Sequence, residues 1–497
     1  MNSSVLLLEI LVTVLSLGVL LADLWVAPAT RRHLGYLAAA LVLGIFAFGV
    51  EDAAEVTHAF VAPGARHGMY VHDGLSVFFK EFFLLAAAMV LVLGAEFSDR
   101  FLSGASEFQS LTLFALLGMM LAASANDLIL MFAALELITI TFVVLNSFQR
   151  HRAASIEAGV KYLILGATAS AFLVFGIALV FGSANTTNFS ELAAMQKTLA
   201  GNRLFLAGLL LVLFGLAFKI AAFPFQVWAP DVYQGSPAPA TAFLAVGSKA
   251  AGFVLLLRLL FGAVPSITAQ WTPLLVAVAA VTILYGSLCA IPQRNLKRLM
   301  GYSSIANAGF LLLGVAAVSK AGSVAVLYYL GGYLFTVLAA FAVITVVVRA
   351  LDSDDISAVA GLGQRSPFLA AALTLSMVSL AGVPPLAGFF GKFLLLKSII
   401  PLGAADSRYY WLLAVAIAGV VMSLYYYFGV IRAIYWGTTP AQPAPLPVSW
   451  PLRVGLGVCV AGMLWLGVLP DSLMKVAVPA VEVLKPEAPA GYPVAGR

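Results

Sequence analysis

Of the 497 residues of the chain, 62% are hydrophobic and only 10% are charged, and the net charge is +5. Soluble domains are about 45–50% apolar and about 25% charged, so this composition excludes a water-soluble enzyme. It also excludes a disordered chain, which would be poor in apolar residues. The basic excess lies mostly in short loops, as membrane topology requires, and does not indicate nucleic-acid binding.

Apolar runs of about 17–25 residues recur along the chain, and each can cross a bilayer core of about 30 Å as a helix. Lipid permits only helices or closed barrels, and the runs lack the alternation of barrel strands. The sequence therefore predicts an all-α polytopic membrane protein of about fourteen helices. In chain order they are expected at 5–27, 34–50, 77–94, 108–125, 127–145, 160–182, 204–223, 239–260, 271–291, 299–318, 324–348, 367–400, 410–434 and 452–468.

The first predicted helix is not a cleaved signal peptide, because no basic segment precedes it and Arg31 and Arg32 follow it. Basic residues gather in cytoplasmic loops, so we expect the loop after this helix in the cytoplasm and both termini outside. Loops assigned to the same side contain Arg100, Arg150, Arg152, Arg294, Lys297, Arg298, Arg349, Arg365, Arg432 and Arg453.

Two of the predicted helices contain breakers. The segment 218–224 (FKIAAFP) ends the seventh helix, and 381–385 (AGVPP) interrupts the twelfth. Proline lacks an N–H and clashes with the preceding turn, so each site frees backbone carbonyls at membrane depth. Broken helices in corresponding places of two halves are typical of transporters built from inverted repeats. Two sets of five helices, ending at the eighth and the thirteenth, fit such a repeat.

Five charged residues lie where an apolar helix would not be expected to contain them. An ionisable group in mid-membrane costs about 2.5 kcal/mol or more, which makes it a functional candidate. Glu136 is near the middle of the fifth helix and Lys249 is well inside the eighth. Lys219 precedes the first break, Lys392 follows the second, and Lys161 is near the start of the sixth helix.

Each of these residues also has a simpler interpretation. A lysine near a helix end can snorkel, with its stem in lipid and its ammonium in water, and this alternative applies to Lys219, Lys392 and Lys161. It does not suit Lys249, whose neighbours are small and which is distant from both membrane surfaces. Glu136 could be a neutral, hydrogen-bonded acid. Three further charged residues near helix ends are expected at the membrane interface: Glu9, Asp23 and Arg258.

The five candidates suit proton transfer. Burial disfavours a charged lysine and a nearby carboxylate favours it, so a lysine can change protonation when its partner moves. A row of such lysines with water between them is a relay that needs no metal and no nucleophile. The two cysteines are far apart, and no haem, iron–sulfur, dinucleotide or P-loop motif is present, so no redox centre is expected in this chain. All five histidines fall in loops or at helix ends: His33, His58, His67, His72 and His151.

Several segments carry a resemblance to a known family. They are 118–128 (GMMLAASANDL), 135–137 (LEL), 157–162 (EAGVKY), 218–219 (FK), 224–237 (PFQVWAPDVYQGSP), 295–305 (NLKRLMGYSSI) and 382–392 (GVPPLAGFFGK). Together they resemble the antiporter-like membrane subunits of bacterial proton-pumping NADH–quinone oxidoreductase, respiratory complex I, a family shared with cation/proton antiporters. The lysine at 392 favours the N or L branch over the M branch, and 228–237 leans toward the N branch.

The resemblance implies fourteen helices with inverted repeats of helices four to eight and nine to thirteen. The corresponding divisions are 1–107, 108–260, 261–434 and 435–497. It also implies a bacterial inner (plasma) membrane location beside other membrane subunits of the complex. NADH, FMN, iron–sulfur clusters and quinone are expected in partner subunits, with no metal, cofactor or nucleic acid bound by this chain.

The resemblance assigns roles to the charged residues. Glu136 matches the helix-five glutamate, Lys219 its helix-seven partner, and Lys249 the central helix-eight lysine. Lys392 matches the helix-twelve lysine near the exit, and Lys161 the helix-six lysine. All five are expected to act in a proton relay.

Two positions depart from the family pattern. Gln226 and Asn307 stand where many relatives have histidine. An amide does not carry a proton as imidazole does, so water is expected to substitute at both steps.

Two rival functions stay open. One is a subunit of a cation/proton antiporter or of a membrane-bound hydrogenase-type pump. The other is a structural membrane anchor whose charges pair during assembly, which the cost of midplane charges on three or more helices disfavours.

Overall fold

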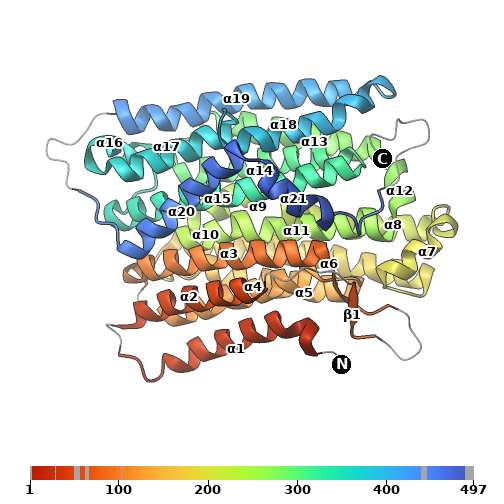
Figure 1. Ribbon diagram of the computed structural model, residues 1–497, viewed down its shortest axis with the longest axis horizontal. Helices are drawn as coiled ribbons and strands as arrows, with labels where there is room; N and C mark the ends of the chain where they lie inside the picture. The colour runs from red at the N-terminus through yellow and green to blue at the C-terminus, as the bar shows by residue number, and fades with distance from the viewer. Residues whose placement is uncertain are drawn as a thin grey trace.

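The structure is a computed structural model that describes residues 3–27, 30–49, 56–61, 67–101, 103–437 and 445–486. The helices run side by side with their axes nearly parallel, so the chain folds as one bundle (Figure 1). The predicted C-terminal tail from residue 487 lies outside the described residues.

The first half of the bundle begins with three helices and a short hairpin. These are α1 (Leu7–Ala22), α2 (Arg31–Gly49), β1 (Thr57–Ala59), β2 (Tyr70–His72) and α3 (Gly74–Phe97). There follow α4 (Ala105–Ala123), α5 (Leu128–Asn146), α6 (Ala153–Ala184), α7 (Phe189–Leu199), α8 (Arg203–Ile220) and α9 (Trp228–Gly235).

A single long helical segment then contains α10 (Ala238–Phe243), η4 (Leu244–Ser248), α11 (Lys249–Leu257) and η5 (Arg258–Ala263). It corresponds to the predicted eighth helix. Its η4 and η5 parts are π-helical turns, and such turns occur most often at functional sites. The sequence analysis did not predict them. One turn lies directly before Lys249 and the other begins at Arg258.

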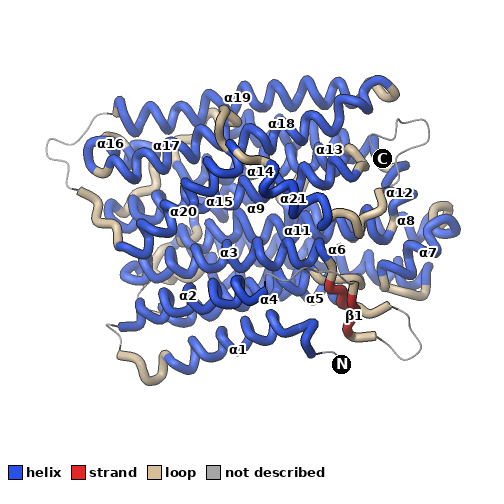
Figure 2. Tube along the Cα trace, viewed as in Figure 1, coloured by secondary structure: helices blue, strands red, loops and turns tan. Residues whose placement is uncertain are grey.

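The second half continues in the same manner. It contains α12 (Pro265–Gln270), α13 (Thr272–Ala290), α14 (Leu296–Ala316), α15 (Lys320–Leu351), α16 (Leu362–Arg365), α17 (Pro367–Ala381), α18 (Ala387–Ile399), α19 (Arg408–Trp436), α20 (Trp450–Val468) and α21 (Asp471–Ala480). Figure 2 shows helix nearly throughout, with the β1–β2 hairpin at one end of the bundle.

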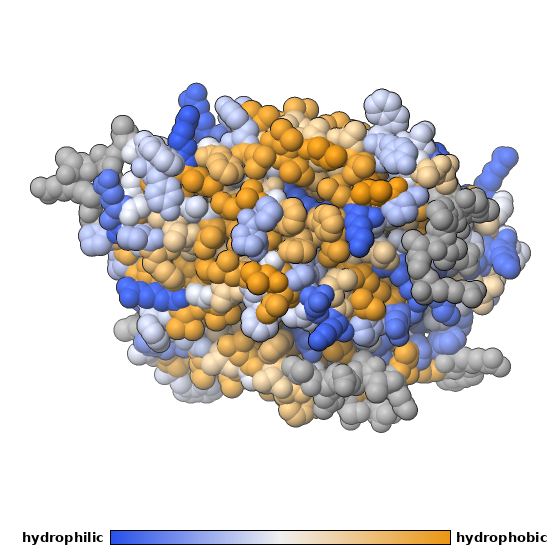
Figure 3. Space-filling model, turned by 45° about the horizontal axis from the view of Figure 1, so that its top comes forward, coloured by the Kyte–Doolittle hydropathy of each residue, from blue (hydrophilic) through white to orange (hydrophobic). Residues whose placement is uncertain are grey.

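Thirteen of the described helices are long and apolar enough to cross a membrane, and Leu7–Ala22 and Pro367–Ala381 are shorter apolar helices. The prediction of an all-α polytopic membrane protein is confirmed, while the count of fourteen and the repeats stay predictions. Hydrophobic residues cover much of the face seen in Figure 3, and hydrophilic ones gather mainly toward its two ends. Large hydrophobic side chains are exposed there to lipid rather than to water.

The helices differ greatly in burial. In the apolar window of α6 only 28% of the residues are buried, whereas in Ala238–Ala263 all are, and in α14 94% are. The eighth predicted helix and α14 therefore form the core of the bundle. Lys249, Arg258 and Lys297 on these segments therefore face protein, not lipid.

Both predicted helix breaks are present. α8 ends at Ile220 and is followed by Ala221 with φ +58°, and α17 ends at Ala381 and is followed by Gly382 with φ +84°. Each left-handed residue stops the helix and leaves carbonyls in its last turn without intrahelical partners.

Loops predicted to share one side of the membrane meet at one end of the bundle. Asp352, after α15, accepts hydrogen bonds from Arg100, after α3, and from Arg152, after α5. Arg349 Nη1 lies 2.6 Å from Glu96 Oε2 and ties α15 to α3. The side of the membrane on which this end lies stays a prediction.

Candidate functional site: a row of buried lysines

Three of the predicted lysines lie inside the bundle. Lys219 on α8 is 4% exposed, Lys249 on α11 is 3% exposed and Lys392 on α18 is 4% exposed. Side chains buried to this extent do not reach the surface of the molecule, which argues against snorkelling. The break that follows Lys219 and the break that precedes Lys392 place both residues beside interrupted helices.

Lys219 is held by hydroxyl groups. Its Nζ donates to Thr139 Oγ1 at 3.1 Å and to Tyr162 OH at 3.4 Å. Hydroxyls both donate and accept hydrogen bonds, so these partners can bond an ammonium or a neutral amine. The α8 stem of Lys219 packs against α11, since a Cβ added at Gly252 would lie 3.4 Å from Lys219 Cγ.

Glu136 lies one helical turn before Thr139 on α5 but does not pair directly with Lys219. The carboxylate is partly exposed and accepts a hydrogen bond from Ser170 Oγ on α6, at 2.7 Å from Oε2. Among the ion pairs of the described residues, none joins Glu136 to Lys219. The side chain therefore faces the outer, α6 side of the bundle, with Thr139 between it and the buried amine.

Lys249 bonds to α14 across the core of the bundle. Its Nζ donates to the backbone carbonyl and to the hydroxyl of Ser304, and it lies 5.6 Å from the centre of the Tyr333 ring. The Ser304 hydroxyl is also within 2.8 Å of Tyr233 OH and 3.4 Å of Tyr333 OH. Ser304 thus links the buried amine to the hydroxyls of Tyr233 and Tyr333.

A second group of hydroxyls continues along α14. Asn307 Nδ2 donates to Ser303 Oγ at 3.4 Å, and Asn307 Oδ1 accepts from Tyr329 OH at 2.7 Å. Ser303 Oγ lies 2.5 Å from Tyr427 OH on α19. Asn307 therefore bonds directly to hydroxyls. Sequence reasoning singled out this position but missed its neighbours, although the spacing of Ser303, Asn307 and Tyr329 on helix faces could have indicated them.

Lys392 is held by the carbonyls that the second break frees. Its Nζ donates to Leu380 O at 2.7 Å and to Ala381 O at 3.4 Å, and it lies 4.9 Å from the centre of the Phe310 ring. The last carbonyls of a helix carry partial negative charge and lack intrahelical partners, so they are suitable ligands for an ammonium group. Phe310 is one turn beyond Asn307 on α14, which brings Lys392 to the end of the same row.

Lys161 does not join this row. Its side chain is 39% exposed, and Nζ lies 2.6 Å from both Glu157 Oε1 and Asp231 Oδ2. Asp231 Oδ1 is also 2.5 Å from Arg298 Nη1. Partial burial raises the pKa of Asp231, but the hydrogen bonds from Lys161 and Arg298 outweigh it and leave that pKa below its usual value. The group ties α6, α9 and α14 together at the surface.

Several buried polar atoms near the lysines have no hydrogen-bond partner among the described residues. They include Gln226 Oε1, which follows the first break, and Ser248 Oγ, next to Lys249 in the chain. Buried water usually bonds to polar atoms of this kind, and the water expected at Gln226 stays a prediction. In the described part of the chain no group of three or more His, Cys, Asp and Glu side chains could hold a metal.

The structure buries Glu9 and Arg258 within the protein, which the sequence did not indicate, and their placement at the membrane interface stays a prediction. Glu9 is 4% exposed and Arg258 is 6% exposed, and each forms an ion pair with α3 or its N-cap, Glu9 with Lys80 and Arg258 with Asp73. The sequence analysis expected both at the membrane interface because they lie near helix ends. Their opposite charges come from another part of the chain, so the pairing gave no local signal.

Fold and site define a polytopic helical membrane protein that carries a row of lysines through its protein core. A family model described as NADH:quinone oxidoreductase/Mrp antiporter, transmembrane, matches residues 125–423. The chain is 41% identical over 478 residues to the NADH-quinone oxidoreductase subunit N of Moorella thermoacetica, covering 96% of this chain and 98% of the relative. It is 37% identical over 479 residues to that of Desulforamulus reducens, covering 96% and 97%.

Solved structures of related membrane subunits have the same fold. A chain of respiratory complex I from Thermus thermophilus with bound aureothin is 32% identical and superposes with a TM-score of 0.77, over 95% of this chain and 99% of that one. A chain of an archaeal membrane-bound sulfane sulfur reductase, at 24% identity, shares the fold with a TM-score of 0.86 over 97% and 98%. The chain therefore belongs to the family of NADH:quinone oxidoreductase and Mrp antiporter membrane subunits, in its subunit N branch.

Proposed function

We propose that the chain translocates protons as a membrane subunit of an NADH–quinone oxidoreductase. The observation that carries this proposal is the burial of Lys219, Lys249 and Lys392 in one row, each bonded to hydroxyls or free carbonyls. Three charges buried without a carboxylate partner of their own are costly for packing alone. Relatives 37–41% identical over nearly the whole chain bear the name of this subunit.

The relay starts at Glu136 and passes to Lys219 across the Thr139 hydroxyl. Lys219 and Lys249 lie on the neighbouring helices α8 and α11. Ser248, the residue before Lys249, has a buried hydroxyl without a partner among the described residues, and water bound there could connect the two lysines. From Lys249 the row continues through the hydroxyls of α14 to Lys392. Water bound to unpartnered polar atoms would close the gaps, because bridging water bonds nearly as well as a direct partner.

Three further features of the relay belong to this proposal. Lys161, which is partly exposed beside Asp231, donates or accepts protons where the relay meets the surface of the protein. The amides of Gln226 and Asn307 hold water or hydroxyls where imidazole would carry protons itself. Two inverted repeats, 108–260 and 261–434, would place the two broken helices in equivalent positions.

Electron transfer and quinone chemistry take place in partner subunits, which hold NADH, FMN, iron–sulfur clusters and quinone. Their free energy would reach this chain as a change in the electrostatics of the relay. Moving one charge against 100 mV costs about 2.3 kcal/mol, within reach of making and breaking a buried ion pair. The chain lies in a bacterial inner membrane with both termini outside the cytoplasm.

The test uses the intact complex, reconstituted in vesicles, with single alanine variants. We expect Lys219→Ala and Glu136→Ala to abolish turnover coupled to pumping and Lys249→Ala to impair it strongly. Lys397→Ala is the matched control, since this lysine is exposed on the same helix as Lys392 and should leave pumping unchanged. A normal number of protons moved per electron in all three variants would contradict the relay.

The same experiment separates the rival functions. A structural anchor predicts that the complex fails to assemble without Lys219, whereas an assembled but inactive complex supports the relay. A cation/proton antiporter subunit would purify without flavin and iron–sulfur subunits. The family model covers both groups, but the relatives of highest identity reported above carry the oxidoreductase name.

A further inference from the structure

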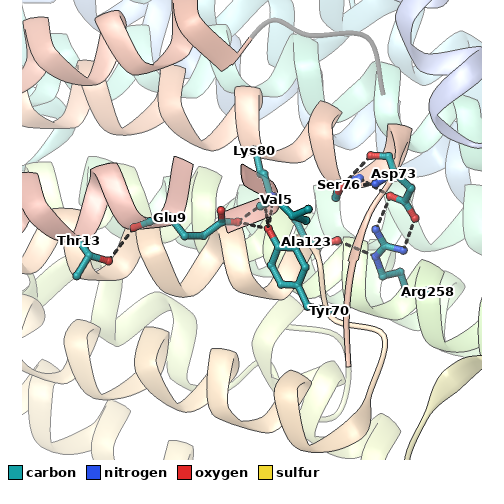
Figure 4. Close-up of polar contacts among 9 residues, drawn as sticks. All are labelled: Val5, Glu9, Thr13, Tyr70, Asp73, Ser76, Lys80, Ala123 and Arg258. Carbon is teal, nitrogen blue, oxygen red and sulfur yellow. Dashed lines mark hydrogen bonds and ion pairs between the residues drawn. The ribbon is translucent and has the colours of Figure 1, made fainter. Parts of the chain in front are cut away.

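A second group of buried charges lies outside the row of lysines, at the end of the bundle where the β1–β2 hairpin lies (Figure 4). α3 and the residue that caps it carry both halves of this group. Asp73 caps the N-terminus of α3, and Lys80 follows two helical turns later. Asp73 pairs with Arg258 on η5, and Lys80 pairs with Glu9 on α1. All four side chains are less than a tenth exposed.

In the Asp73–Arg258 pair, every guanidinium nitrogen and both carboxylate oxygens have a hydrogen-bond partner. Arg258 Nη2 lies 2.7 Å from Asp73 Oδ1 and Nη1 lies 2.9 Å from Oδ2, in a bidentate pair. Arg258 Nε donates to Ala123 O at 2.7 Å, and Ser76 N donates to Asp73 Oδ1 at 2.8 Å. Both oxygens and all three kinds of guanidinium nitrogen are used. This pair is a fixed clamp.

The Glu9–Lys80 pair is different, because one carboxylate oxygen is unused. Glu9 Oε1 lies 2.9 Å from Lys80 Nζ and accepts from Tyr70 OH at 2.7 Å, and Lys80 Nζ also lies 2.6 Å from Tyr70 OH. Glu9 Oε2 is buried and has no hydrogen-bond partner in the part of the chain that the structure describes. A buried carboxylate oxygen without a donor is costly unless a proton or a water binds to it.

A cavity of about 600 Å³, open to the surface, is lined by the Asp73–Arg258 pair and not by Glu9, Tyr70 or Lys80 themselves. Asp73, Arg258, His58 and His67 line it, together with Lys485, whose side chain is exposed at its mouth. Val71, beside Tyr70, is another lining residue, and its backbone N–H donates to Ser124 O at 2.9 Å. The hydroxyl of Ser124 is buried and has no partner among the described residues. The cavity wall therefore adjoins the strand that carries Tyr70, and Ser124, whose buried hydroxyl is unpartnered among the described residues, is bonded to that wall through its carbonyl.

We propose that Glu9, Tyr70 and Lys80 form a proton-binding site in the N-terminal helices, separate from the row of lysines and fed with water through this cavity. An excess proton that arrives as H3O⁺ along that water forms an O–H bond at Glu9 Oε2 and leaves neutral water behind, and Lys80 keeps its own proton, so the group gains one positive charge. The Asp73–Arg258 clamp fixes Tyr70 and the cavity wall and does not exchange protons. This inference rests on the proposed proton translocation.

Among the described residues, few groups face Glu9. Lys80 on α3 and Tyr70 on β2 contact its carboxylate, and Thr13 bonds only to its backbone carbonyl. Ser124, Asp73 and Arg258 are the next polar groups, on the cavity side of Tyr70. Burial and the charge of Glu9 raise the pKa of Tyr70, which keeps its phenol neutral and able to donate.

The test measures protons moved per electron in vesicles with the intact complex. Glu9→Gln keeps the size of the side chain and removes its charge, and we expect a loss of proton uptake of about 2-fold or more. In infrared difference spectra between mildly acid and neutral pH, a carboxylic-acid band of the wild type should be missing in this variant. Thr13→Val, one turn away on α1, is the matched control and should change neither quantity.

A double variant separates proton binding from simple structural support. Glu9→Gln with Lys80→Gln leaves no unpaired charge in the core, so a purely structural pair would let it recover wild-type pumping. We expect no recovery. Recovery, or an unchanged infrared band in Glu9→Gln, would overturn the proposal. If the charge variants fail to assemble, Tyr70→Phe retains both charges, and normal pumping in that variant would overturn it equally.

Lys219→Ala in the same preparation separates this site from the relay. Lost pumping in Lys219→Ala with normal pumping in Glu9→Gln would reject the N-terminal site and leave the relay in place. Normal pumping in both would reject both.

Discussion

The two helix breaks are built alike, yet their surroundings differ. In each break a left-handed residue, Ala221 or Gly382, follows the last helical residue. Ten residues further on (221 to 231 and 382 to 392), the first break has Asp231 at the surface and the second has Lys392 in the core. The same local construction therefore positions an anion outside in one half and a cation inside in the other.

The freed carbonyls are also satisfied differently. At the first break Trp228 Nε1 donates to Phe218 O at 3.0 Å, so a neutral indole caps α8 and Lys219 bonds to hydroxyls instead. At the second break Lys392 itself caps α17. A hydroxyl can donate to a neutral amine, whereas a carbonyl only accepts. Lys219 thus has partners for both of its protonation states, and Lys392 has partners only for its N–H groups.

Arginine at the two lysine positions gives the largest expected effect. Arginine is charged at every accessible pH, so Lys219→Arg cannot change protonation and should lose pumping by about 100-fold or more, as for other proton-transfer groups. Lys392→Arg also loses an amine that can change protonation, but its guanidinium can still donate to Leu380 O and cap α17, so we expect a smaller loss of pumping. The measurement is proton uptake by vesicles during NADH oxidation. Equal losses in the two variants would remove the distinction between the breaks.

The hydroxyls around Lys219 give the next effect. Tyr162→Phe and Thr139→Val each remove one partner of Nζ and keep the shape of the site. A lost hydrogen bond to a charged group costs about 1.5–3 kcal/mol, and we expect each variant to lose pumping by about 10-fold while remaining assembled. Ser170→Ala removes only the donor to Glu136 and should cost less. An unchanged rate in Tyr162→Phe would contradict the hydroxyl-held site.

Apolar runs, breakers and isolated charges were enough to predict the helical bundle, both breaks and the burial of three lysines. These signals are local, since hydropathy and proline act on their own segment of chain. The partners of each lysine could not be predicted in this way. Ser304 meets Lys249 from a helix 55 residues away, and its hydroxyl is unremarkable in an apolar sequence. Glu9 and Arg258 illustrate the same point, because the opposite charge that each one meets lies in another part of the chain.

Substitutions at Ala221 and Gly382, the residues with positive φ that end α8 and α17, should have a smaller effect, and it falls on stability rather than on pumping. Gly382 has φ +84°, and a Cβ there would lie 3.0 Å from Lys392 Cδ. Gly382→Ala should therefore lower the free energy of unfolding by about 1–2 kcal/mol. Ala221 already has φ +58° with a side chain, so Ala221→Gly should raise it by up to about 1 kcal/mol. Melting of the purified subunit complex in detergent measures both, and a stabilising Gly382→Ala would contradict the comparison.

Replacing Asp231 should have the smallest effect on stability, because both of its basic partners have a second acceptor. Its pKa is lowered by Lys161 and Arg298, so the charged form contributes stability above the unfolded value of about 3.9, and this contribution is lost as the pH falls through the lower, folded value. Asp231→Asn should cost about 1 kcal/mol or less at neutral pH, since the side chain is partly exposed. Lys161 keeps Glu157, and Arg298 keeps Gln234.

The decisive measurement for Asp231 is the difference in melting temperature between wild type and Asp231→Asn across the acid range. That difference should shrink toward zero as the pH falls below about 4, because both proteins then lack the charge. A difference that stays constant with pH would mean that the carboxylate acts through packing alone. In that case the charge at the tenth residue after the break would matter in the second half of the chain and not in the first.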